Sequence, residues 1–569
     1  MCACNPGAQR VKLRRVESKP YLTRIEIGYN LAQKLRIIPL GGLGEIGKNM
    51  TVYEYGRNIM VVDCGVMFPD SEMHGIDLVL PDYQYVVEHQ DRLRGIVITH
   101  GHMDHIAALP YLLRELNAPI YGTPLTLGLI ERQLKEKNLL DNADLRPLRQ
   151  GKPLHLGPFE VTPFAVAHSI PDSVGFVIKT PVGTLVHTGD YKLDETPAGG
   201  ETTDLDALRR LTQDGVLAML GDSTNADRPG RTPTEQVVGE TLDRLLAGAR
   251  GQRVIIATFS SLLARLQEIM HLAHKHGRKV ALTGRSLVEN VKLAQDLGYL
   301  DVPPGLLVDV TDRVPKGKML ILATGSQGEP RSALNQMAND QHRNVHVGHG
   351  DLVVISGGTI PGNEEVVGAM LNKLFERGAH VVYGAMETVH VSGHGSRDEL
   401  RAMLETVQPR YFIPVHGEAR HLHLHGQLAE QAGMHADDIF ILKDGAQWVT
   451  DGEQVWLDKP LPVDQVFVDG RLIGEIGEIV MRDRQRLSQD GFIVALIPIN
   501  AQKKLVGEPQ IVSRGVVYTQ GDTDLLDASR EVVKRQYKRG TRNLRRALED
   551  FIYHETHLRP VVLPQFIQV

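Results

Sequence analysis

The sequence predicts an α/β protein built from several domains, and three observations carry this prediction. At 569 residues the chain is too long for a single hydrophobic core. Between residues 217 and 384, short apolar strands alternate with amphipathic helices, which is typical of a doubly wound parallel sheet. Residues 35–63 instead hold three apolar segments joined by short turns, which predicts an antiparallel sheet. We therefore expect an antiparallel sheet region and a separate parallel α/β domain.

The individual elements can be placed along the chain by their apolar patterns. Before residue 217 we expect strands over 35–40, 50–55, 58–63, 96–99, 161–167 and 183–189, and a helix over 106–116. In the next part we expect strands over 253–258, 279–282, 319–323, 352–355 and 380–383, and helices over 233–248, 261–276 and 362–376. Further on we expect a strand over 410–415, a Gly- and Pro-rich linker over 451–475, strands near 491–499 and 511–519, and basic helices near 523–556.

Composition and charge narrow the class of protein. The net charge of −6 provides no global basic field for nucleic-acid binding, so a polyanionic substrate would need local basic patches or metal ions. No apolar run is long enough to span a bilayer, so we expect no membrane association. Three cysteines cannot form a disulfide framework and indicate a reducing compartment, so we expect a cytoplasmic location. Residues 1–30 lack an apolar signal core and are expected to be a flexible leader.

A turn rich in metal-binding side chains follows the predicted strand 96–99. Residues 100–105 read His-Gly-His-Met-Asp-His, with a predicted helix directly after them. Neutral imidazole nitrogens and carboxylate oxygens are ligands that zinc prefers. The alternative is a polar loop that happens to be rich in histidine. Four donors in six residues between a strand and a helix favour a metal site.

Further candidate ligands follow other predicted strands. Asp63 ends one strand, whereas His168, Asp190 and His416 each come directly after another. One rim of a sheet can bring such strand ends together, as expected when that rim builds a binding site. These positions therefore extend the histidine-rich turn into a larger candidate constellation.

The order of these residues resembles the metallo-β-lactamase superfamily, in which HxHxDH is followed by a distant His, a distant Asp and a last His. The resemblance implies an αββα sandwich that holds two divalent metals, with Asp63 orienting one of the ligands. The implied ligands are His100, His102 and His168 for one metal, Asp104, His105 and His416 for the other, and Asp190 as the bridge between them. These ligands suit zinc best, and manganese also supports hydrolysis at such sites.

The long segment between Asp190 and His416 narrows the resemblance. Residues 221–224 (GDST), 390–394 (HVSGH) and 414–418 (PVHGE) look like motifs of the β-CASP nucleases. Together with GGLGEIGKN, VVDCGVMFPD, ATGSQGEP and a C-terminal domain, they resemble the bacterial ribonuclease J family. The implied division is a leader (1–30), a metallo-β-lactamase domain in two parts (31–216 and 387–450), an inserted doubly wound β-CASP domain (217–386), a linker (451–475) and a small α/β C-terminal domain (476–569).

The resemblance implies a two-metal ribonuclease that acts on single-stranded RNA in rRNA processing, RNA maturation and mRNA decay. It would be a 5′-to-3′ exonuclease preferring 5′-monophosphate ends, with endonuclease activity in addition. His394 would protonate the leaving oxygen, Asp222 would orient His394, and Asp190 would act with the metals. A helix cap or a surface acid is the alternative for Asp222. The implied RNA contacts are Thr258, Phe259, Ser260, His390, Val391, Ser392, Gly393 and His394, and the loop 325–329 is either a further phosphate loop or a simple turn.

Other segments of the sequence have more than one interpretation. Gly75, Asp77 and Asp469 match positions of a structural calcium in some members of the family. The basic run 534–546 is a solvated face, an RNA patch or part of a dimer interface. The family implies a homodimer or homotetramer formed through the C-terminal domain, and partners in an RNA-degrading complex. The competing functions are a β-CASP nuclease acting on DNA and a non-catalytic scaffold subunit of such a complex.

Overall fold

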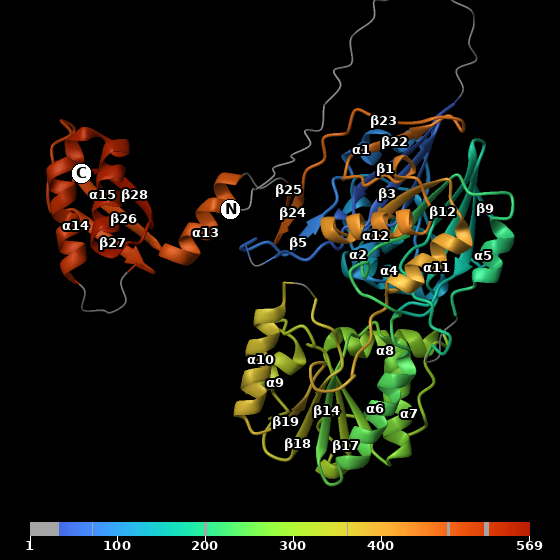
Figure 1. Ribbon diagram of the computed structural model, residues 1–569. Helices are drawn as coiled ribbons and strands as arrows, with labels where there is room; N and C mark the ends of the chain where they lie inside the picture. The colour runs from blue at the N-terminus through green and yellow to red at the C-terminus, as the bar shows by residue number, and fades with distance from the viewer. Residues whose placement is uncertain (1–32, 71, 198–201, 361, 475–477, 517–522) are drawn as a thin grey trace, which may run out of the picture. The chain divides into compact units, whose positions relative to one another are not determined.

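The computed structural model of the protein describes residues 33–70, 72–197, 202–360, 362–474, 478–516 and 523–569 (Figure 1). The predicted leader, residues 1–30, lies outside the described residues. Within the described part of the chain, no helix is both long and apolar enough to cross a membrane.

Two sheets face each other across a shared core in the sandwich part of the chain. The side chains between them include Tyr53, Phe159, Phe176 and Trp448, all of them buried. The first sheet consists, in pairing order, of β23 (Val455–Asp458), β22 (Gln447–Thr450), β1 (Leu35–Gly41), β3 (Met50–Tyr55), β4 (Asn58–Val62), β6 (Leu93–Val97), β7 (Pro119–Gly122) and β8 (Asp144–Pro147). The second consists of β20 (Tyr411–Val415), β13 (Ala218–Asp222), β12 (Gly183–His187), β11 (Val174–Thr180), β10 (Phe159–Ala165) and β9 (Leu154–Leu156).

Helices cover the outer faces of both sheets, which gives the αββα order of layers. Because side chains alternate along a strand, each strand serves the inner core with one set of residues and an outer core with the other. The helices on the first sheet are α1 (Gln84–Glu88), α2 (Met103–Ile106), α3 (Leu109–Leu112) and α4 (Pro124–Glu136). Those on the second are α5 (Leu205–Leu211), α11 (Arg397–Val407) and α12 (Ala419–Gln431).

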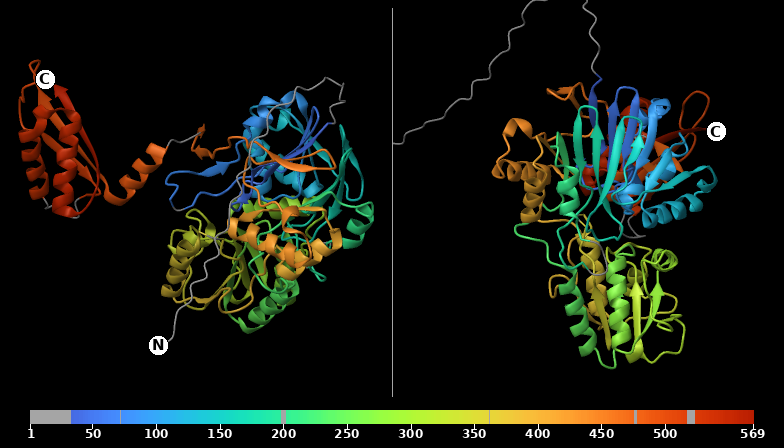
Figure 2. Two further views of the ribbon diagram at one scale, coloured as in Figure 1. Left: turned by 45° about the horizontal axis from the view of Figure 1, so that its top comes forward. Right: turned by 90° about the vertical axis from the view of Figure 1, so that its right-hand side faces the viewer.

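A second domain is built on a six-stranded, all-parallel sheet, with helices on both faces as Figures 1 and 2 show. Its strands, in pairing order, are β16 (Leu307–Val308), β15 (Lys279–Thr283), β17 (Met319–Ala323), β14 (Arg253–Ala257), β18 (Asp351–Ile355) and β19 (His380–Val382). One face packs against α6 (Glu235–Gly248), α7 (Leu263–Lys275) and α8 (Arg285–Asp296), and the other against α9 (Ala333–Ala338) and α10 (Glu364–Glu376). The near-continuous apolar strands of this sheet follow from burial on both faces.

This parallel domain is inserted between two neighbouring strands of the sandwich. The chain leaves the second sheet after β13 and returns to it in β20, which pairs with β13 in parallel from Ala218↔Tyr411 to Asp222↔Val415. The C-terminal ends of both strands therefore lie at the same rim. That rim also receives the turns that follow β6, β10 and β12, so the insertion begins and ends beside the histidine-rich turn.

The segment 451–474 is more structured than its Gly and Pro content predicted. Its strand β23 extends the first sandwich sheet by pairing with β22. Its strands β24 (Val466–Asp469) and β25 (Leu472–Gly474) form a small sheet with β5 (Leu78–Leu80), far away in the sequence. A two-stranded contact between β2 (Leu43–Gly44) and β21 (Gly417–Glu418) adds a further long-range tie.

The last part of the chain has its own core, with helices against one face of a three-stranded sheet. Ile493, Ala495 and Ile497 alternate along β26 toward the helices and pack with residues such as Leu544 and Leu548. Its elements are α13 (Glu478–Asp490), β26 (Phe492–Ile499), β27 (Gln510–Arg514), α14 (Thr523–Gln536), α15 (Thr541–Thr556) and β28 (Val561–Gln568). The strand β26 runs parallel to β28 and antiparallel to β27.

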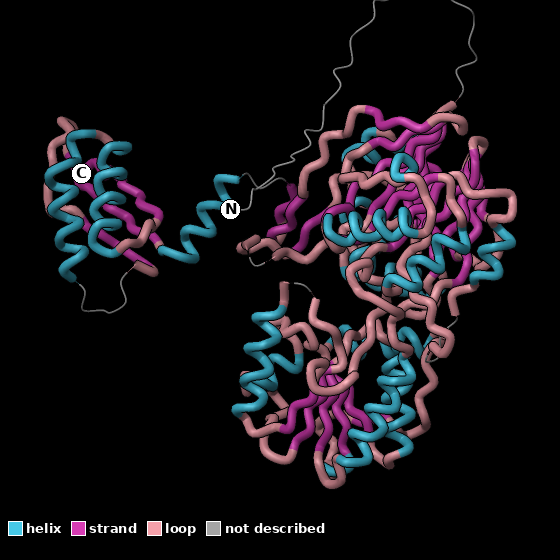
Figure 3. Tube along the Cα trace, viewed as in Figure 1, coloured by secondary structure: helices cyan, strands magenta, loops and turns pink. Residues whose placement is uncertain are grey.

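The structure confirms the predicted α/β class, the sandwich, the inserted parallel domain and the small C-terminal domain. Figure 3 shows the helices, strands and loops in different colours. The helix predicted over 106–116 is wrong: α2 ends at Ile106, and α3 is a separate four-residue helix with Pro110 in its first turn. Proline lacks the N–H that a continuous helix would need there. The elements that the pattern did not place include the helices α4, α5, α8, α9, α11, α12 and α13 and the strand β28. Of the strand predicted near 511–519, residues 517–519 lie outside the described part.

Candidate metal centre

Three histidines from the turns after β6 and β10 direct ring nitrogens to one point. His102 Nδ1 lies 3.0 Å from His100 Nε2 and 3.1 Å from His168 Nε2. His168 is held by its other nitrogen, because Nδ1–H donates to the Gly393 carbonyl at 2.8 Å. A Cβ at Gly393 would lie 2.8 Å from the His168 ring, so this close contact needs glycine.

The protonation of these rings matches a cation site. Burial lowers the pKa of His102 to about 4 and lowers the pKa of His100 and His168 well below the usual value. Neutral rings then bring lone pairs together, which is unfavourable without a positive charge between them. Neutral imidazole is also the form in which histidine binds metals. The donor set therefore fits a divalent metal.

A second group joins Asp104, His105, Asp190 and His416, whose ligand atoms all lie within 4.8 Å of one another. His105 Nε2 is 3.2 Å from Asp190 Oδ2, and His416 Nε2 is 3.3 Å from Asp104 Oδ2. Asp190 Oδ2 also lies 3.6 Å from His100 Nε2 and 3.8 Å from His168 Nε2. One carboxylate oxygen of Asp190 thus faces both groups of donors.

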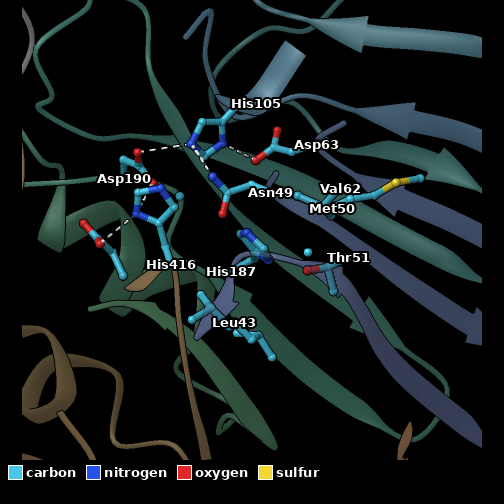
Figure 4. A pocket seen from close by; sticks show the side chains of 14 residues that line it. Leu43, Asn49, Met50, Thr51, Val62, Asp63, His105, His187, Asp190 and His416 are labelled. Carbon is cyan, nitrogen blue, oxygen red and sulfur yellow. Dashed lines mark hydrogen bonds and ion pairs between the residues drawn. The ribbon is translucent and has the colours of Figure 1, made fainter. Parts of the chain in front are cut away.

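Asp63 lies behind the second group and fixes the orientation of His105. Its carboxylate accepts hydrogen bonds from Thr99 N, Thr99 Oγ1 and His105 Nδ1, each at 2.8 Å, and Figure 4 shows His105 between Asp63 and Asp190. The bond to Nδ1 leaves the Nε2 lone pair for the site. Asp63 has a φ of 62°, a conformation that non-glycine residues rarely adopt, so the backbone is strained where it turns the carboxylate inward.

His394 and Asp222 form a close pair beside the two donor groups. His394 Nδ1–H donates to Asp222 Oδ2 at 2.7 Å, and His394 Nε2 lies 4.0 Å from Asp190 Oδ2. Burial alone would lower the pKa of His394, but the Asp222 carboxylate outweighs it and raises this pKa above its usual value. Asp222 is buried at the end of β13, so it is neither a helix cap nor a surface acid.

Sequence reasoning missed several residues that hold this constellation. Thr224 Oγ1 lies 2.8 Å from Asp222 Oδ1 and 2.6 Å from His416 Nδ1, so it ties the two together. His416 has a φ of 55°, and its Nδ1 lies 3.5 Å from Asp222 Oδ1 at the end of β13. Asn49 Nδ2 lies 3.2 Å from His105 Nε2. Thr224 could have been predicted as a site residue because it belongs to the GDST motif. Nothing in the sequence links Asn49 with His105.

A cavity extends behind the second donor group, toward the inside of the sandwich. Its lining includes Asn49, Thr51 and His187 as well as Asp63, His105, Asp190 and His416 (Figure 4). His187 bonds through Nδ1 to the Tyr53 hydroxyl at 2.9 Å, and burial lowers its pKa to about 4. The floor of the site is thus polar but uncharged at His187.

The predicted RNA-contacting residues form two neighbouring loops. Thr258 is buried and donates to the Ser356 carbonyl, and the rings of Phe259 and His390 have centroids 6.4 Å apart. Val391 is buried, so only its backbone can face a ligand. Ser260, Ser392 and Gly393 complete the two loops, and Gly393 and His394 connect the second loop with the metal donors.

The loop 325–329 is held in place by hydrogen bonds of the Gln327 side chain. Gln327 Nε2 donates to the Gly358 carbonyl at 2.7 Å, and its Oε1 accepts from Ile360 N at 2.8 Å. Ser326 and Gln327 are both buried. The glutamine therefore serves to join this loop to the segment after β18.

The residues predicted to bind calcium lie close together, but the positively charged side chain of Arg484 already lies beside them. The pairing of β5 with β24 brings Gly75 and Asp77 beside Asp469. Asp77 Oδ2 accepts from Gly470 N at 2.7 Å, and Asp469 is ion-paired with Arg484, which also donates to the His74 carbonyl at 3.1 Å. A calcium ion at this position would have to displace the Arg484 guanidinium.

Family models match most of the described chain. The model described as Beta-lactamase superfamily domain matches residues 60–209, and Zn-dependent metallo-hydrolase RNA specificity domain matches 378–441. Ribonuclease J, beta-CASP domain matches residues 251–374, and Ribonuclease J C-terminal domain matches 479–569. A crystal structure of a protein of unknown function from Enterococcus faecalis shares the fold, with a TM-score of 0.51 and 14% identity over 73% of this chain and 100% of that one.

Relatives of known name match nearly the whole length. Ribonuclease J2 of Bacillus subtilis is 40% identical over 94% of this chain and 99% of its own. Ribonuclease J 1 of Streptococcus pyogenes is 39% identical over 93% of this chain and 97% of its own. The fold and the two groups of histidine and aspartate donors, together with the matching family models, define a metal-dependent hydrolase of the metallo-β-lactamase superfamily. Within it, the chain belongs to the ribonuclease J family.

Proposed function

We propose that this protein, a metal-dependent ribonuclease of the ribonuclease J family, degrades RNA from 5′-monophosphate ends in the 5′-to-3′ direction and also cuts internally. The observation that carries the proposal is the position of Asp190, whose Oδ2 faces histidine nitrogens of both donor groups. Two divalent metals held there would neutralise the scissile phosphate and activate water for attack. The roles in rRNA processing, RNA maturation and mRNA decay belong to the same proposal.

The residue roles follow from the donor chemistry. His100, His102 and His168 are proposed to hold one metal, Asp104, His105 and His416 the other, and Asp190 both. Zinc fits these nitrogen and oxygen donors, and manganese is the competing metal. Asp63 is proposed to keep the His105 lone pair directed at the site, because its carboxylate accepts the Nδ1 hydrogen.

His394 is the proposed proton donor for the leaving oxygen. Its Nδ1–H is engaged by Asp222, so its Nε2 is free to hold the proton that the leaving group needs. A pKa raised by Asp222 keeps that proton in place near neutral pH. The residues proposed to contact RNA are those of the loop 258–260, which follows β14, and of the loop 390–394, whose Gly393 carbonyl accepts from His168.

Further parts of the proposal concern organisation. The proposed division is a leader (1–30), a metallo-β-lactamase domain (31–216 and 387–450), a β-CASP domain (217–386), a linker (451–475) and a C-terminal domain (476–569). A homodimer or homotetramer through the C-terminal domain, a cytoplasmic location and partners in RNA degradation are proposed on the family relationship. Calcium at Gly75, Asp77 and Asp469 remains a prediction.

The test uses RNA labelled at its 3′ end and carrying a 5′-monophosphate, a 5′-triphosphate or a 5′-hydroxyl. Each substrate is incubated with the protein and with His102→Ala, with zinc and manganese supplied separately. We expect progressive shortening, fastest from the monophosphate end, and none with His102→Ala. A parallel incubation with single-stranded DNA of the same sequence distinguishes a ribonuclease from a nuclease that acts on DNA.

Two results would contradict the proposal. Degradation of DNA while RNA stays intact would favour the DNA nuclease. Intact RNA and DNA in a protein shown to contain two metals would favour the scaffold subunit, although that reading predicts incomplete donor sets and both sets here are complete.

A further inference from the structure

The loop 390–394 presents two groups whose hydrogen-bond direction is decided by residues behind them. The groups are the His390 ring and the Ser392 hydroxyl, both only half-buried. Imidazole and hydroxyl can each donate or accept, so their sequence alone does not say which they do. Their neighbours in the structure settle the direction in both cases.

Arg265 settles the direction of His390. The guanidinium NH1 lies 2.8 Å from His390 Nδ1, and a guanidinium nitrogen can only donate. Nδ1 of His390 must therefore be the acceptor, and the ring hydrogen must be on Nε2. Within the described residues, no protein acceptor is bonded to Nε2, which lies beside Gly358.

The guanidinium has no freedom to turn away. Arg265 is buried, its NH2 donates to both oxygens of Glu235 at 2.8 and 2.7 Å, and its NH1 also donates to the Ser356 carbonyl at 3.1 Å. Lys192, which pairs with Asp194 at 3.0 Å, lies 3.9 Å from Glu235 and adds positive charge behind it. Burial and then Arg265 lower the pKa of His390 to about 3, so the ring stays neutral in this one tautomer.

Asn225 settles the direction of Ser392. Asn225 Nδ2 lies 2.8 Å from the His394 carbonyl, which can only accept, so the atom at that position is the amide nitrogen. The same nitrogen donates to Ser392 Oγ at 2.9 Å, and His394 N donates to Ser392 Oγ at 3.2 Å. Both acceptor positions of the hydroxyl are thus filled. Its own hydrogen has no acceptor among the described residues and is left to donate to a ligand.

We propose that Arg265 and Asn225 are positioning residues that make His390 Nε2–H and Ser392 Oγ–H obligatory donors for an RNA phosphate group. Phosphate oxygens at neutral pH only accept, so a surface that only donates selects them over a neutral 5′-hydroxyl. Asn225 and Arg265 lie on different parts of the chain, yet both act from behind the same loop. This inference rests on the proposed function, since it concerns how that site distinguishes RNA ends.

The first experiment compares Arg265→Met with Arg265→Lys on RNA of one sequence with a 5′-monophosphate or a 5′-hydroxyl. Loss of one directed bond to a charged group corresponds to about a tenfold effect. We expect Arg265→Met to raise KM for the monophosphate RNA about tenfold, with kcat and the hydroxyl RNA little changed. Lysine, which also only donates, should retain part of the preference.

Arg253→Met is the matched control for loss of a buried arginine pair. Arg253 pairs with Asp351 at 2.6 Å at the start of β14, at the opposite end of the strand from the substrate loops. It should lower stability without changing the preference between the two RNA ends. An equal change of preference in Arg253→Met and Arg265→Met would overturn the proposal.

A pH series separates a directed bond from a merely structural role. The charged groups that lower the pKa of His390 are Arg265, Lys192 and Arg228. Burial also lowers this pKa and stays in place, so removing Arg265 raises the pKa only in part. As the pH falls, KM for monophosphate RNA should therefore begin to decrease at a higher pH in Arg265→Met than in wild type. A profile that stays parallel to wild type would contradict the assignment of Arg265.

The second experiment tests Asn225 by a double-mutant cycle with Ser392→Ala. Asn225→Ala should raise KM for monophosphate RNA about tenfold when Ser392 is present, and at most about twofold when Ser392 is already alanine. Equal effects in the two backgrounds would show that Asn225 does not act through Ser392. Wild-type protein that cleaves neither RNA would refute the proposed function itself, whereas unchanged preference in both variants would refute this inference alone.

Discussion

The two sides of the candidate site are built with opposite hydrogen-bond polarity. On the metallo-β-lactamase side, lone pairs point inward, and each is fixed by a group behind the ring, such as Asp63 behind His105 and the Gly393 carbonyl behind His168. On the loop 390–394, the donors Arg265 and Asn225 occupy the acceptor positions of His390 Nδ1 and Ser392 Oγ, so that these two groups are left with hydrogens to donate. The difference between the two sides shows how the protein can select ions. Groups that present lone pairs favour cations, groups that present hydrogens favour anions, and the residues behind each group decide which of the two it presents.

Breaking the acceptor side should have the largest effect. Asp190→Ala removes the oxygen that faces both donor groups, so we expect both metals to be lost and kcat/KM to fall on the order of 10³-fold or more. Elemental analysis of the purified protein gives metal content beside the RNA assay. Asp243→Asn, at an exposed pair with Lys275, serves as control, and full metal content in Asp190→Ala would contradict the bridging role.

The next largest effect is expected at His394, the proposed proton donor, which connects the loop 390–394 with the metal donors. His394→Ala should lower kcat about 10²- to 10⁴-fold while metal content stays unchanged. Because Asp222 raises the pKa of His394, Asp222→Asn should lower that pKa. The fall in activity at alkaline pH should then begin at a lower pH than in wild type, and a profile unchanged in pH would count against His394 as the acid.

A smaller effect is expected where the two sides are joined. The buried Glu399 carboxylate accepts from Leu193 N at 2.8 Å, Thr232 N at 2.6 Å and Ser396 N at 2.8 Å. Glu399→Gln places an amide group among these donors, so we expect the free energy of unfolding to fall by about 2 to 4 kcal/mol. Denaturant titration measures it. Stability equal to wild type would show that the three bonds are dispensable.

The smallest expected effect is a change in stability at Asp444. Its carboxyl group lies on the metallo-β-lactamase side but belongs to neither group of metal donors. Burial and then Glu45 raise the pKa of Asp444 to about 7, although Lys48 lies 3.6 Å away. A raised carboxyl pKa stabilises the fold fully below about pH 4, and this contribution is lost as the pH rises toward 7. Asp444→Asn should therefore be more stable than wild type at pH 8, by about 1 to 2 kcal/mol, and gain nothing at pH 4. Thermal unfolding at both pH values checks the sign.

The sequence predicted the parts of the fold that depend on local periodicity. The strands and most helices of the parallel domain, the antiparallel start and the order of the metal-binding turn could all be read from apolar spacing and residue type. Strand ends such as Asp190 and His416 could be assigned to one rim because parallel neighbours end together. Pro110 lies inside the predicted helix 106–116, and because proline lacks an N–H the break there was predictable from the sequence.

What could not be predicted depends on contacts across long sequence distances. Arg265 and His390 are 125 residues apart, and Asn225 and Ser392 are 167 apart, so no spacing rule connects them. The positive φ values of Asp63 and His416 follow from the surrounding structure rather than from residue preference. The pairing of β24 with β5 likewise turned an apparently irregular segment into strands.

The insertion between β13 and β20 has a consequence for how the chain folds during synthesis. The parallel partner of β13 is not made until residues 223–410 have followed it. At 5–20 residues per second this takes roughly 10 to 40 s, during which β13 is an open sheet edge. The inserted domain, whose strands pair only with one another, can fold in that interval. Ribosome pausing or truncation before residue 411 would therefore leave an aggregation-prone edge beside an incomplete metal site.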